Sequence, residues 1–347
     1  MPCARASGAW WTYCSKPVGE SVIKLEIEQE DWPINGSFII ARGAETVARV
    51  ITVQLDDGEF RGRGESEPQD HYGESLESVI EQIESVRQTL ASGMSRFRLQ
   101  TALPPGAARN AVDCALWDLE AKRAGRRAWQ LAGLAQAPAE TSVYTISLDT
   151  PARMAAQASG YAGWPILKLK LGGGSDIDRV RAVHEAVPGV RLIVDANESW
   201  TLQELRDFSP QLKELAVELI EQPLPAGQDS ALAGLDLPLP ICADESCHTV
   251  ESLASIRGLY DFVNIKLDKT GGLTEALRLA AAAEQMGFRI MTGCMTGTSL
   301  AMAPATIIAA LSEYVDLDGP LLLLKDREPG IHYEKGRMFP VSEDVWG

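Results

Sequence analysis

The sequence has no stretch of about 18 consecutive apolar residues, so it predicts no transmembrane helix. Basic residues are scarce relative to acidic ones: 32 Lys and Arg stand against 48 Asp and Glu, and the formal net charge is −16. This balance argues against a nucleic-acid or anionic-membrane surface, because both need clustered cations. Only four His are present and no Cys-x-x-Cys pair occurs, so a zinc site is not expected.

The six cysteines are scattered along the chain, which is typical of reduced thiols in a cytoplasmic protein and not of a disulfide framework. The first twenty residues lack the continuous apolar segment of a secretory signal. We interpret residues 1–20 as a disordered extension, with a misassigned start site as the alternative. The overall composition, 45% hydrophobic and 23% charged, is that of an ordinary globular protein with a large core.

Strand-like and helix-like segments alternate from residue 140 onward, and we expect a barrel over 140–320. Strands that alternate with helices predict βαβ units and a parallel sheet. Eight such units favour a closed (β/α)₈-type barrel over an open doubly wound sheet. The apolar runs begin at Ser142, Ile166, Arg191, Glu218, Pro240, Phe262, Arg289 and Glu313, and the helical stretches include 176–187, 202–215, 273–286 and 300–311.

Residues 21–134 have a different pattern, which predicts an α+β capping domain. Its strand-like segments alternate apolar and polar residues, as antiparallel strands do, and Asp56-Asp57-Gly58 is a hairpin signal. A tail at 321–347 is expected to return to this cap. The predicted strands are 22–29, 38–41 and 46–55, and the predicted helices are 75–91 and 107–124.

Acidic residues stand where three consecutive barrel strands are predicted to end: Asp195, Glu221 and Asp244. They are about one βα unit apart, so they should lie side by side on the C-terminal rim, where barrel enzymes keep their active sites. Three acids brought together repel one another unless a cation joins them, and an all-oxygen set suits Mg²⁺. The alternative is that each acid caps the helix that follows its strand.

Lysines are predicted at the same rim. Lys168 and Lys170 are two residues apart in the second strand, so both point to one face, and Lys266 ends the sixth strand across the barrel mouth. Burial near a dication and another lysine lowers a lysine pKa toward neutrality and makes the amine a usable base. Charge balance for the three acids is the alternative role. Lys269 is interpreted as a solvated loop lysine.

Two opposed bases and a dication suggest a reaction class. The metal would bind a substrate carboxylate and stabilise the enediolate that forms when the α-proton leaves. One lysine would remove that proton and the other would return one from the opposite face, which inverts the α-carbon. Two readings compete: a Schiff-base aldolase, which would not need three carboxylates, and a non-enzymatic binding barrel, which would not need the lysines.

Six motifs, in order and at barrel spacing, resemble the muconate-lactonising subgroup of the enolase superfamily, and within it the dipeptide epimerases. The resemblance extends over nearly the whole chain from about Val22. It implies Mg²⁺-dependent epimerisation of L-Ala-D/L-Glu in murein peptide recycling, with muconate cycloisomerase or o-succinylbenzoate synthase as the alternative. The motifs are KLKLGGG (168–174), IVDANESW (193–200), IEQPL (220–224), CADES (242–246), NIKLDKTGG (264–272) and VDLDGP (315–320).

The resemblance also implies roles for single residues. Asp195, Glu221 and Asp244 match the metal ligands, and Lys170 and Lys266 match the two acid/base groups. The other matches are Lys168, which contacts the substrate carboxylate; Asn197 and Glu245, which support the ligands; and Asp316 and Asp318, which hold the free α-ammonium of a dipeptide. Two carboxylates are suited to bind an ammonium group, and the substrates of the muconate-type enzymes contain no ammonium group. The alternative role of these two residues is to form a turn, where Asp is favoured.

The resemblance extends to the cap. Arg42, in FIIARG, matches the loop that selects the second side chain, and its guanidinium could pair with a glutamate carboxylate; a surface arginine is the alternative. Tyr72, in EPQDHYG, is expected to shape the pocket. The segment CMTGTS stands where many relatives have an acid, so Thr298 is a candidate substitute, and Thr145 completes the predicted substrate contacts. The expected partner is a small dipeptide, and a homo-oligomer is compatible with the sequence.

Overall fold

The computed structural model describes residues 22–347. The extension predicted at residues 1–20 lies outside the described residues. Three antiparallel strands come first: β1 (Lys24–Ile40), β2 (Gly43–Asp56) and β3 (Arg61–Ser66). β1 pairs with β2 along almost its whole length, with one register shift between Pro33 and Phe38. The strands predicted at 22–29 and 38–41 are therefore two halves of one strand, since a proline interrupts the hydrogen-bond ladder locally.

Helix α4 (Ala107–Ala124) packs on this sheet and has the bounds that its sequence predicts. It ends at Gly125, whose φ of 60° is a left-handed cap. β3 approaches α4 so closely that a Cβ on Gly62 or Gly64 would lie 2.2 Å from a backbone oxygen of the helix. The other cap helices are η1 (Asp70–Tyr72), α1 (Leu76–Ser85), α2 (Arg87–Ala91), α3 (Arg96–Ala102) and α5 (Ala128–Leu131), so the helix predicted at 75–91 is divided into α1 and α2.

Eight parallel strands follow and curl into a half-barrel in the order β11-β10-β9-β8-β7-β6-β5-β4. The outer strands approach each other where Ser142 and Val315 form a parallel bridge. The barrel-type fold predicted from the sequence is confirmed, and all eight predicted runs contain a strand. These are β4 (Tyr144–Ile146), β5 (Ile166–Lys170), β6 (Arg191–Asp195), β7 (Val217–Glu221), β8 (Ile241–Ala243), β9 (Phe262–Ile265), β10 (Arg289–Thr292) and β11 (Tyr314–Val315).

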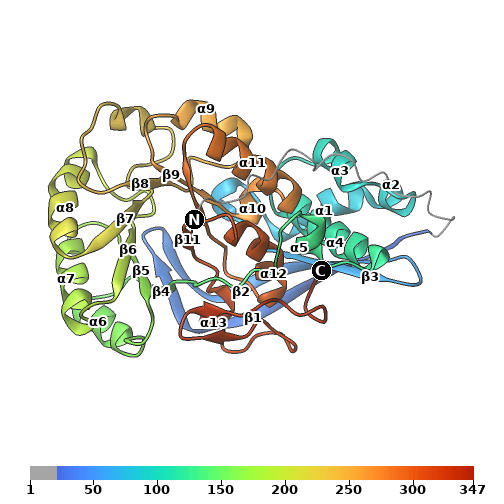
Figure 1. Cartoon of the computed structure of the whole chain (residues 1–347), viewed down its shortest axis with the longest axis horizontal. Helices are drawn as coiled ribbons and strands as arrows, with labels where there is room; N and C mark the ends of the chain where they lie inside the picture. The colour runs from blue at the N-terminus through green and yellow to red at the C-terminus, as the bar shows by residue number, and fades with distance from the viewer. Residues whose placement is uncertain (1–21) are drawn as a thin grey trace.

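Helices surround the half-barrel, and the long β1–β2 hairpin runs from the cap helices toward β4 (Figure 1). The four barrel helices predicted from the sequence are present within two residues of their predicted bounds. The barrel helices are α6 (Pro151–Ser159), α7 (Asp176–Ala186), α8 (Leu202–Glu214), η2 (Asp229–Leu232), η3 (Val250–Ser252), α9 (Leu253–Ile256), α10 (Leu267–Thr270), α11 (Leu273–Gln285), α12 (Ser299–Ala309) and α13 (Gly319–Leu322).

Apolar side chains fill the inside of the barrel below the rim. One buried cluster takes a residue from each strand region, including Ile166, Leu219, Phe262 and Met291. This layer keeps water away from the rim side chains on their inner side. The chain ends in a hairpin of β12 (Tyr333–Glu334) and β13 (Arg337–Met338), and Trp346 then donates to backbone oxygens of the cap. Among the described residues, none of the helices combines the length and apolarity that crossing a membrane requires.

Candidate active site

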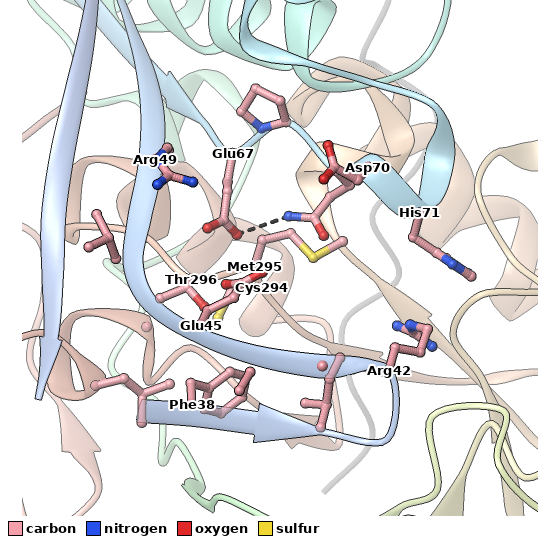
Figure 2. Close-up of a pocket in the computed structure, with 18 of the residues that line it drawn as sticks. Phe38, Arg42, Glu45, Arg49, Glu67, Asp70, His71, Cys294, Met295 and Thr296 are labelled. Atoms are coloured by element: carbon pink, nitrogen blue, oxygen red, sulfur yellow. Dashed lines mark hydrogen bonds between the residues drawn. The ribbon is translucent and has the colours of Figure 1, made fainter. Parts of the chain in front are cut away.

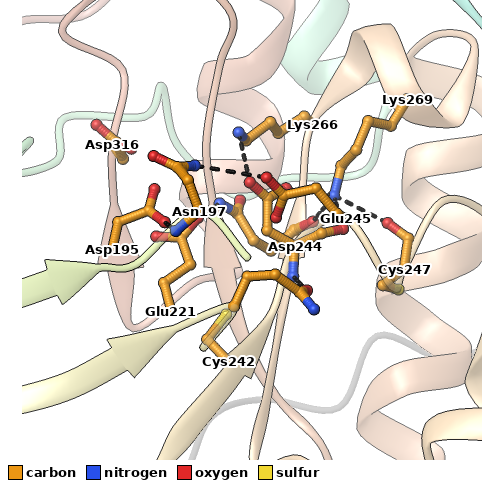
Figure 3. A network of polar contacts seen from close by, with 12 residues as sticks. Asp195, Asn197, Glu221, Cys242, Asp244, Glu245, Cys247, Lys266, Lys269 and Asp316 are labelled. Carbon is orange, nitrogen blue, oxygen red and sulfur yellow. Dashed lines mark hydrogen bonds and ion pairs between the residues drawn. The ribbon is translucent and has the colours of Figure 1, made fainter. Parts of the chain in front are cut away.

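Charged side chains meet at the C-terminal rim of the half-barrel (Figure 3). Asp195 and Glu221 are the last residues of β6 and β7 and face each other in register, and Asp244 directly follows β8. One oxygen from each of the three carboxylates lies within 4.8 Å of the other two, and all three residues are buried. The structure therefore brings the three predicted ligands together within the reach of one ion.

The charges around these acids act on them differently. Burial alone would raise the pKa of Asp195, but the ammonium groups of Lys170 and Lys168 outweigh it and hold that pKa below its usual range. Burial and the negative charge of Asp195 raise the pKa of Glu221 to about 7. The carboxylates therefore repel one another, and a bound cation would offset this repulsion.

The donor set fits a hard dication such as Mg²⁺. All three candidate ligands are carboxylates, which Mg²⁺ prefers. Beside them, Oδ1 of Asn197 and Oε2 of Glu245 are buried and have no hydrogen-bond partner among the described residues. Because buried polar atoms are normally satisfied, these two oxygens indicate that a polar group belongs next to the carboxylates. An ion that keeps several coordinated waters would supply such groups.

Lys168 is fully buried behind the three acids. Its Nζ lies 2.7 Å from Glu221, 2.7 Å from Asp316 and 3.1 Å from Asp195. Burial acts to lower the pKa of Lys168, but these carboxylates, Asp316 first, raise it well above its usual value. The side chain is thus a fixed positive charge that ties the acids to β11.

Lys170 and Lys266 both line one cavity of about 710 Å³, to which the rim and the cap both contribute residues. Figure 2 shows other residues of its lining, among them Arg42 and His71 of the cap. Nζ of Lys170 lies 2.6 Å from Asp195 Oδ2, and Nζ of Lys266 lies 2.7 Å from Asp244 Oδ2. The lysines come from the end of β5 and from the residue after β9, which are four strands apart in the sheet. They therefore reach the cavity from different parts of the rim.

Asp316 and Asp318 form another acidic wall of this cavity, together with Thr145 of β4. The backbone N–H of Thr145 donates to Asp318 (2.6 Å), and its hydroxyl donates to Asp316 (3.4 Å). Burial and the charge of Asp316 raise the pKa of Asp318 to about 7. The arrangement suits a cationic group, whose charge would stabilise both carboxylates in their ionised form.

Two cap segments reach the rim: the turn between β1 and β2, and η1. Arg42, in the turn, donates to Glu245 (2.7 Å) and to Glu198 (3.0 Å). Tyr72, in η1, packs its ring edge against His248 at a centroid distance of 4.6 Å. Tyr72 is not among the residues that line the cavity, whereas its neighbour His71 is.

The interpretation of Lys269 as a solvated loop lysine is wrong. This lysine is not solvated: its side chain is fully buried, and Nζ donates to Asp244 Oδ1 (2.6 Å) and to the backbone oxygens of Cys247 (2.9 Å) and Asn264 (3.0 Å). The physical reason is that α10 begins immediately after Lys266. Residues three apart share one helix face, so Lys269 faces the acids as Lys266 does. That spacing was the signal in the sequence.

Thr298 stands apart from the cavity in the structure. It is buried at the start of α12, where its backbone N–H (2.7 Å) and hydroxyl (2.5 Å) donate to Glu65 of β3. It is not among the residues that line the cavity, although Thr296 of the same segment is. Its partner is 233 residues away in the chain, so no local pattern could indicate this contact.

Sequence reasoning also missed two polar residues that hold the acids in place. Asn264 of β9 donates to Glu221 (2.7 Å), and its position two residues before Lys266 is a usable signal, because alternate strand residues share a face. Gln222 accepts a hydrogen bond from the backbone N–H of Asp244 (2.8 Å). Its φ of 33° turns the chain sharply after β7, which the sequence does not reveal.

A parallel half-barrel with a separate cap, whose rim gathers buried carboxylates and lysines around one cavity, defines a capped barrel enzyme. Residues 22–133 match the family model "Mandelate racemase / muconate lactonizing enzyme, N-terminal domain", and residues 152–338 match "Enolase C-terminal domain-like". The chain therefore belongs to the mandelate racemase / muconate lactonizing enzyme family of the enolase superfamily.

Two characterised relatives are similar along most of the chain. An L-Ala-D/L-Glu epimerase of Escherichia coli is 46% identical over 90% of this chain and 98% of its own length. An N-acetyl-D-glutamate racemase of Pseudoalteromonas is also 46% identical, over 86% of this chain and 95% of its own length.

Solved structures agree with this similarity. An enolase family member from Agrobacterium tumefaciens, with bound sodium and L-Ala-L-Glu, has a TM-score of 0.92 and 50% identity, and the match covers 94% of this chain and 100% of that one. A dipeptide epimerase from Enterococcus faecalis, complexed with Mg and L-Leu-L-Tyr, has a TM-score of 0.85 and 29% identity, covering 91% of this chain and 96% of that one.

Proposed function

We propose that this protein is a Mg²⁺-dependent dipeptide epimerase that interconverts L-Ala-D-Glu and L-Ala-L-Glu. The observation that carries the proposal is the single cavity lined by two lysines, Lys170 and Lys266, and by two acids, Asp316 and Asp318. A dipeptide has a carboxylate and an α-proton for the first pair and an ammonium group for the second. The named relatives that act on or bind L-Ala-Glu support the same substrate.

In this proposal Asp195, Glu221 and Asp244 hold the metal, and Asn197 and Glu245 support them. When bound, Mg²⁺ supplies the positive charge that stabilises the negative charge developing on the substrate carboxylate as the α-proton leaves. The fully buried Lys168 adds a second fixed positive charge at the same place, which is electrostatic stabilisation that needs no reorganisation.

Lys170 and Lys266 move the protons. One of them, as the neutral amine, takes the α-proton, and the other, as the ammonium, returns a proton to the opposite face of the same carbon. Each lysine contacts a carboxylate at the rim, Asp195 or Asp244, which orients its Nζ in the cavity. The reverse reaction exchanges the two roles, so both lysines are needed in both directions.

The two ends of the substrate are proposed to bind to opposite walls. Asp316 and Asp318, oriented by Thr145, receive the α-ammonium of the first residue through charge-assisted hydrogen bonds. Arg42 receives the carboxylate of the glutamate side chain, because its planar guanidinium matches a carboxylate. Tyr72, the last residue of η1, shapes this cap segment through its contact with His248.

A second candidate, racemisation of N-acetylglutamate, is favoured by one observation: a relative with that name is as similar as the Escherichia coli epimerase. N-acetylglutamate has no free ammonium, so Asp316 and Asp318 would face an uncharged amide. These buried acids therefore favour the dipeptide. Muconate cycloisomerase and o-succinylbenzoate synthase activities are not favoured, because these relatives and structures are named as epimerases, a racemase and a dipeptide-bound family member.

Proton NMR in D₂O tests the proposal with L-Ala-L-Glu, L-Ala-D-Glu and N-acetyl-D-glutamate as parallel substrates. With Mg²⁺ present, we expect the α-proton signal of the glutamate residue to disappear from both dipeptides as the other diastereomer forms. EDTA should abolish the exchange and added Mg²⁺ should restore it. Exchange with N-acetyl-D-glutamate alone would favour the second candidate, and turnover that EDTA leaves unchanged would refute the metal-assisted mechanism.

We further propose that the enzyme works in the cytoplasm on dipeptides released during murein recycling. The four cysteines among the described residues are free thiols, as expected in a reducing compartment. A strain that lacks the gene should accumulate L-Ala-D-Glu in its cytoplasmic extract, measured by mass spectrometry, and a plasmid copy should reverse this. An unchanged dipeptide level would contradict this role without affecting the proposed reaction.

A further inference from the structure

One carboxylate on the barrel rim contacts both cap segments that cover the cavity. Oε2 of Glu198 lies 3.0 Å from Nη1 of Arg42, in the β1–β2 turn, and 3.0 Å from Nε2 of His71, in η1. Oε1 of Glu198 accepts a hydrogen bond from the backbone N–H of Ala226 (2.7 Å), in the segment after β7. Three segments that are distant in the sequence thus meet at one side chain, which is mostly buried, with 13% of it exposed.

The backbone that carries this side chain has an uncommon conformation. Asn197 and Glu198 are consecutive non-glycine residues with φ of 43° and 68°, in the left-handed region. The backbone N–H of Glu198 donates to the oxygen of Gln222 (2.9 Å), which holds this loop against the end of β7. Strained conformations of this kind persist where the surrounding structure imposes them, and they are concentrated at functional sites.

The contacts of Arg42 are all on one side of its guanidinium. Nη1 donates to Glu198, to Glu245 and to the backbone oxygen of Asn197, while Nη2 and Nε have no hydrogen-bond partner among the described residues. Since the guanidinium is a rigid planar fork, fixing Nη1 fixes the direction of the two remaining donor groups. Arg42 also lines the cavity, so these donor groups are available to a ligand there.

We propose that Glu198 is a positioning residue: it holds the β1–β2 turn and η1 together over the cavity and orients the free edge of Arg42 toward the distal carboxylate of the substrate. The part about the substrate rests on the proposed function; the part about the two cap segments does not. The competing explanation is a pair of surface ion pairs with no consequence, since exposed pairs contribute little. The two explanations predict different results when Glu198 is replaced: a shared acceptor that holds both segments loosens both when it is removed, whereas pairs without consequence leave both unchanged.

Hydrogen–deuterium exchange of the full chain, without substrate, tests this coupling. In Glu198→Ala we expect the amides of residues 38–45 and of 69–73 both to exchange about 3–10-fold faster, which is the range that losing a partly buried ion pair allows. In His71→Ala only residues 69–73 should change by that amount. Glu185→Ala is the matched control, because Glu185 lies on the barrel helix α7 and not in the cap.

Glu198→Gln guards against a folding defect, since it has the same shape and keeps an oxygen for the N–H of Ala226 while losing the charge. It should show the same faster exchange in both segments. If both Glu198 variants leave the two segments at wild-type rates, or change one segment only, the coupling is refuted. If Glu198→Ala does not fold, the exchange rates of Glu198→Gln alone decide the test.

Steady-state kinetics tests the orientation of Arg42 separately. For L-Ala-L-Glu we expect KM to rise about 5–20-fold in Glu198→Gln while kcat stays within about twofold, because the two cavity lysines and the three proposed metal ligands are unchanged. For L-Ala-L-Met, which has no distal carboxylate, KM should change far less. Equal KM changes for both dipeptides would refute the orienting role. Absence of any dipeptide turnover in the wild type would refute the proposed function, yet the exchange experiment would remain valid for the cap.

Discussion

The lysines at the rim each have a carboxylate partner within hydrogen-bonding distance: Lys170 contacts Asp195 and Lys266 contacts Asp244. The side chains of Lys168 and Lys269, in contrast, are fully buried. At the scale of single residues the site therefore contains two kinds of lysine. One kind faces the cavity and can exchange protons with a ligand, and the other provides fixed charge.

Replacing either cavity lysine should separate the two halves of the proposed reaction. In Lys170→Ala and in Lys266→Ala we expect epimerisation to fall by at least about 10³-fold, because a positioned acid or base contributes roughly that much. Each variant should still exchange the α-proton of one diastereomer in D₂O, and the two variants should prefer opposite diastereomers. Exchange of both diastereomers in both variants, measured by proton NMR, would contradict opposed bases.

Asp318 provides a test of the ammonium wall. Asp318→Asn removes a charge but keeps the shape, so we expect KM for L-Ala-L-Glu to rise about 10–100-fold, the range for a hydrogen bond to a charged group. N-acetyl-D-glutamate, which lacks the ammonium, serves as the control ligand in a competition assay, and we expect the wild type and Asp318→Asn to bind it equally. An unchanged KM for the dipeptide would show that the ammonium binds elsewhere.

At the scale of elements, a side chain of α4, in the cap domain, accepts a hydrogen bond from the N-terminus of the barrel helix α11. Asp113, on α4, is buried and accepts a hydrogen bond from the backbone N–H of Thr274 (2.9 Å) in the first turn of α11. Trp117, one turn further along α4, donates to the Thr274 hydroxyl (2.9 Å). A Cβ on Gly272 would lie 2.5 Å from Asp113, so only glycine allows this approach. The contact fixes the cap helix directly on the barrel.

Asp113 should make stability depend on pH. Burial raises its pKa from 3.8 to about 6 in the folded protein, so the folded state binds this proton more tightly than the unfolded state. The resulting stability is fully present below pH 3.8 and is lost as the pH rises through about 6. The loss amounts to at most roughly 3 kcal/mol in the free energy of unfolding.

Urea unfolding at pH 4.5 and pH 7.5 measures this effect as the difference between the wild type and Asp113→Asn. We expect the wild type to lose stability relative to the variant between the two pH values, because Asn does not titrate. Asp178→Asn, at an exposed position of α7, should run parallel to the wild type. A wild type that gains stability relative to Asp113→Asn over this interval would show the opposite sign and refute the assignment.

At the scale of the whole molecule, Arg327 joins the cap to the barrel and to the C-terminal segment. It donates to Glu65 of β3 (2.8 Å) and to Glu30 of β1 (2.9 Å), and it shares Glu65 with Thr298 at the start of α12. Glu65 is fully buried, so its charge depends on this partner. The network places the cap sheet beside the segment that carries Thr296 of the cavity wall.

Removing the arginine should be costly because it leaves a buried carboxylate without its counter-charge. We expect Arg327→Met to lower the free energy of unfolding by about 3–5 kcal/mol, and Arg327→Met with Glu65→Gln to recover part of the loss. Arg153→Met, at an exposed ion pair, should cost less than about 1 kcal/mol. Equal costs for the two arginines in denaturant unfolding would show that the network does not hold the cap.

The periodic features of this protein could be predicted from the sequence. The apolar run that begins at Ile166 predicts a strand, and the Ala-rich stretch at 273–286 predicts a helix, each from a short local pattern. A parallel barrel repeats this strand–helix unit, so a wrong boundary in one unit does not change the predicted positions of the others. Asp195 and Glu221 could be placed at one rim for the same reason, because equal spacing along a repeating fold brings equivalent positions together.

The sequence by itself determined the strand–helix repeat and the charged residues at its strand ends, because both follow from local periodicity. Only the tertiary structure decided which charges are buried and what they contact: Lys269 under Asp244, Thr298 on Glu65, and Glu198 between Arg42 and His71. Those contacts join residues from separate elements, and whether two such residues meet depends on how the cap and the barrel pack, which no local pattern encodes.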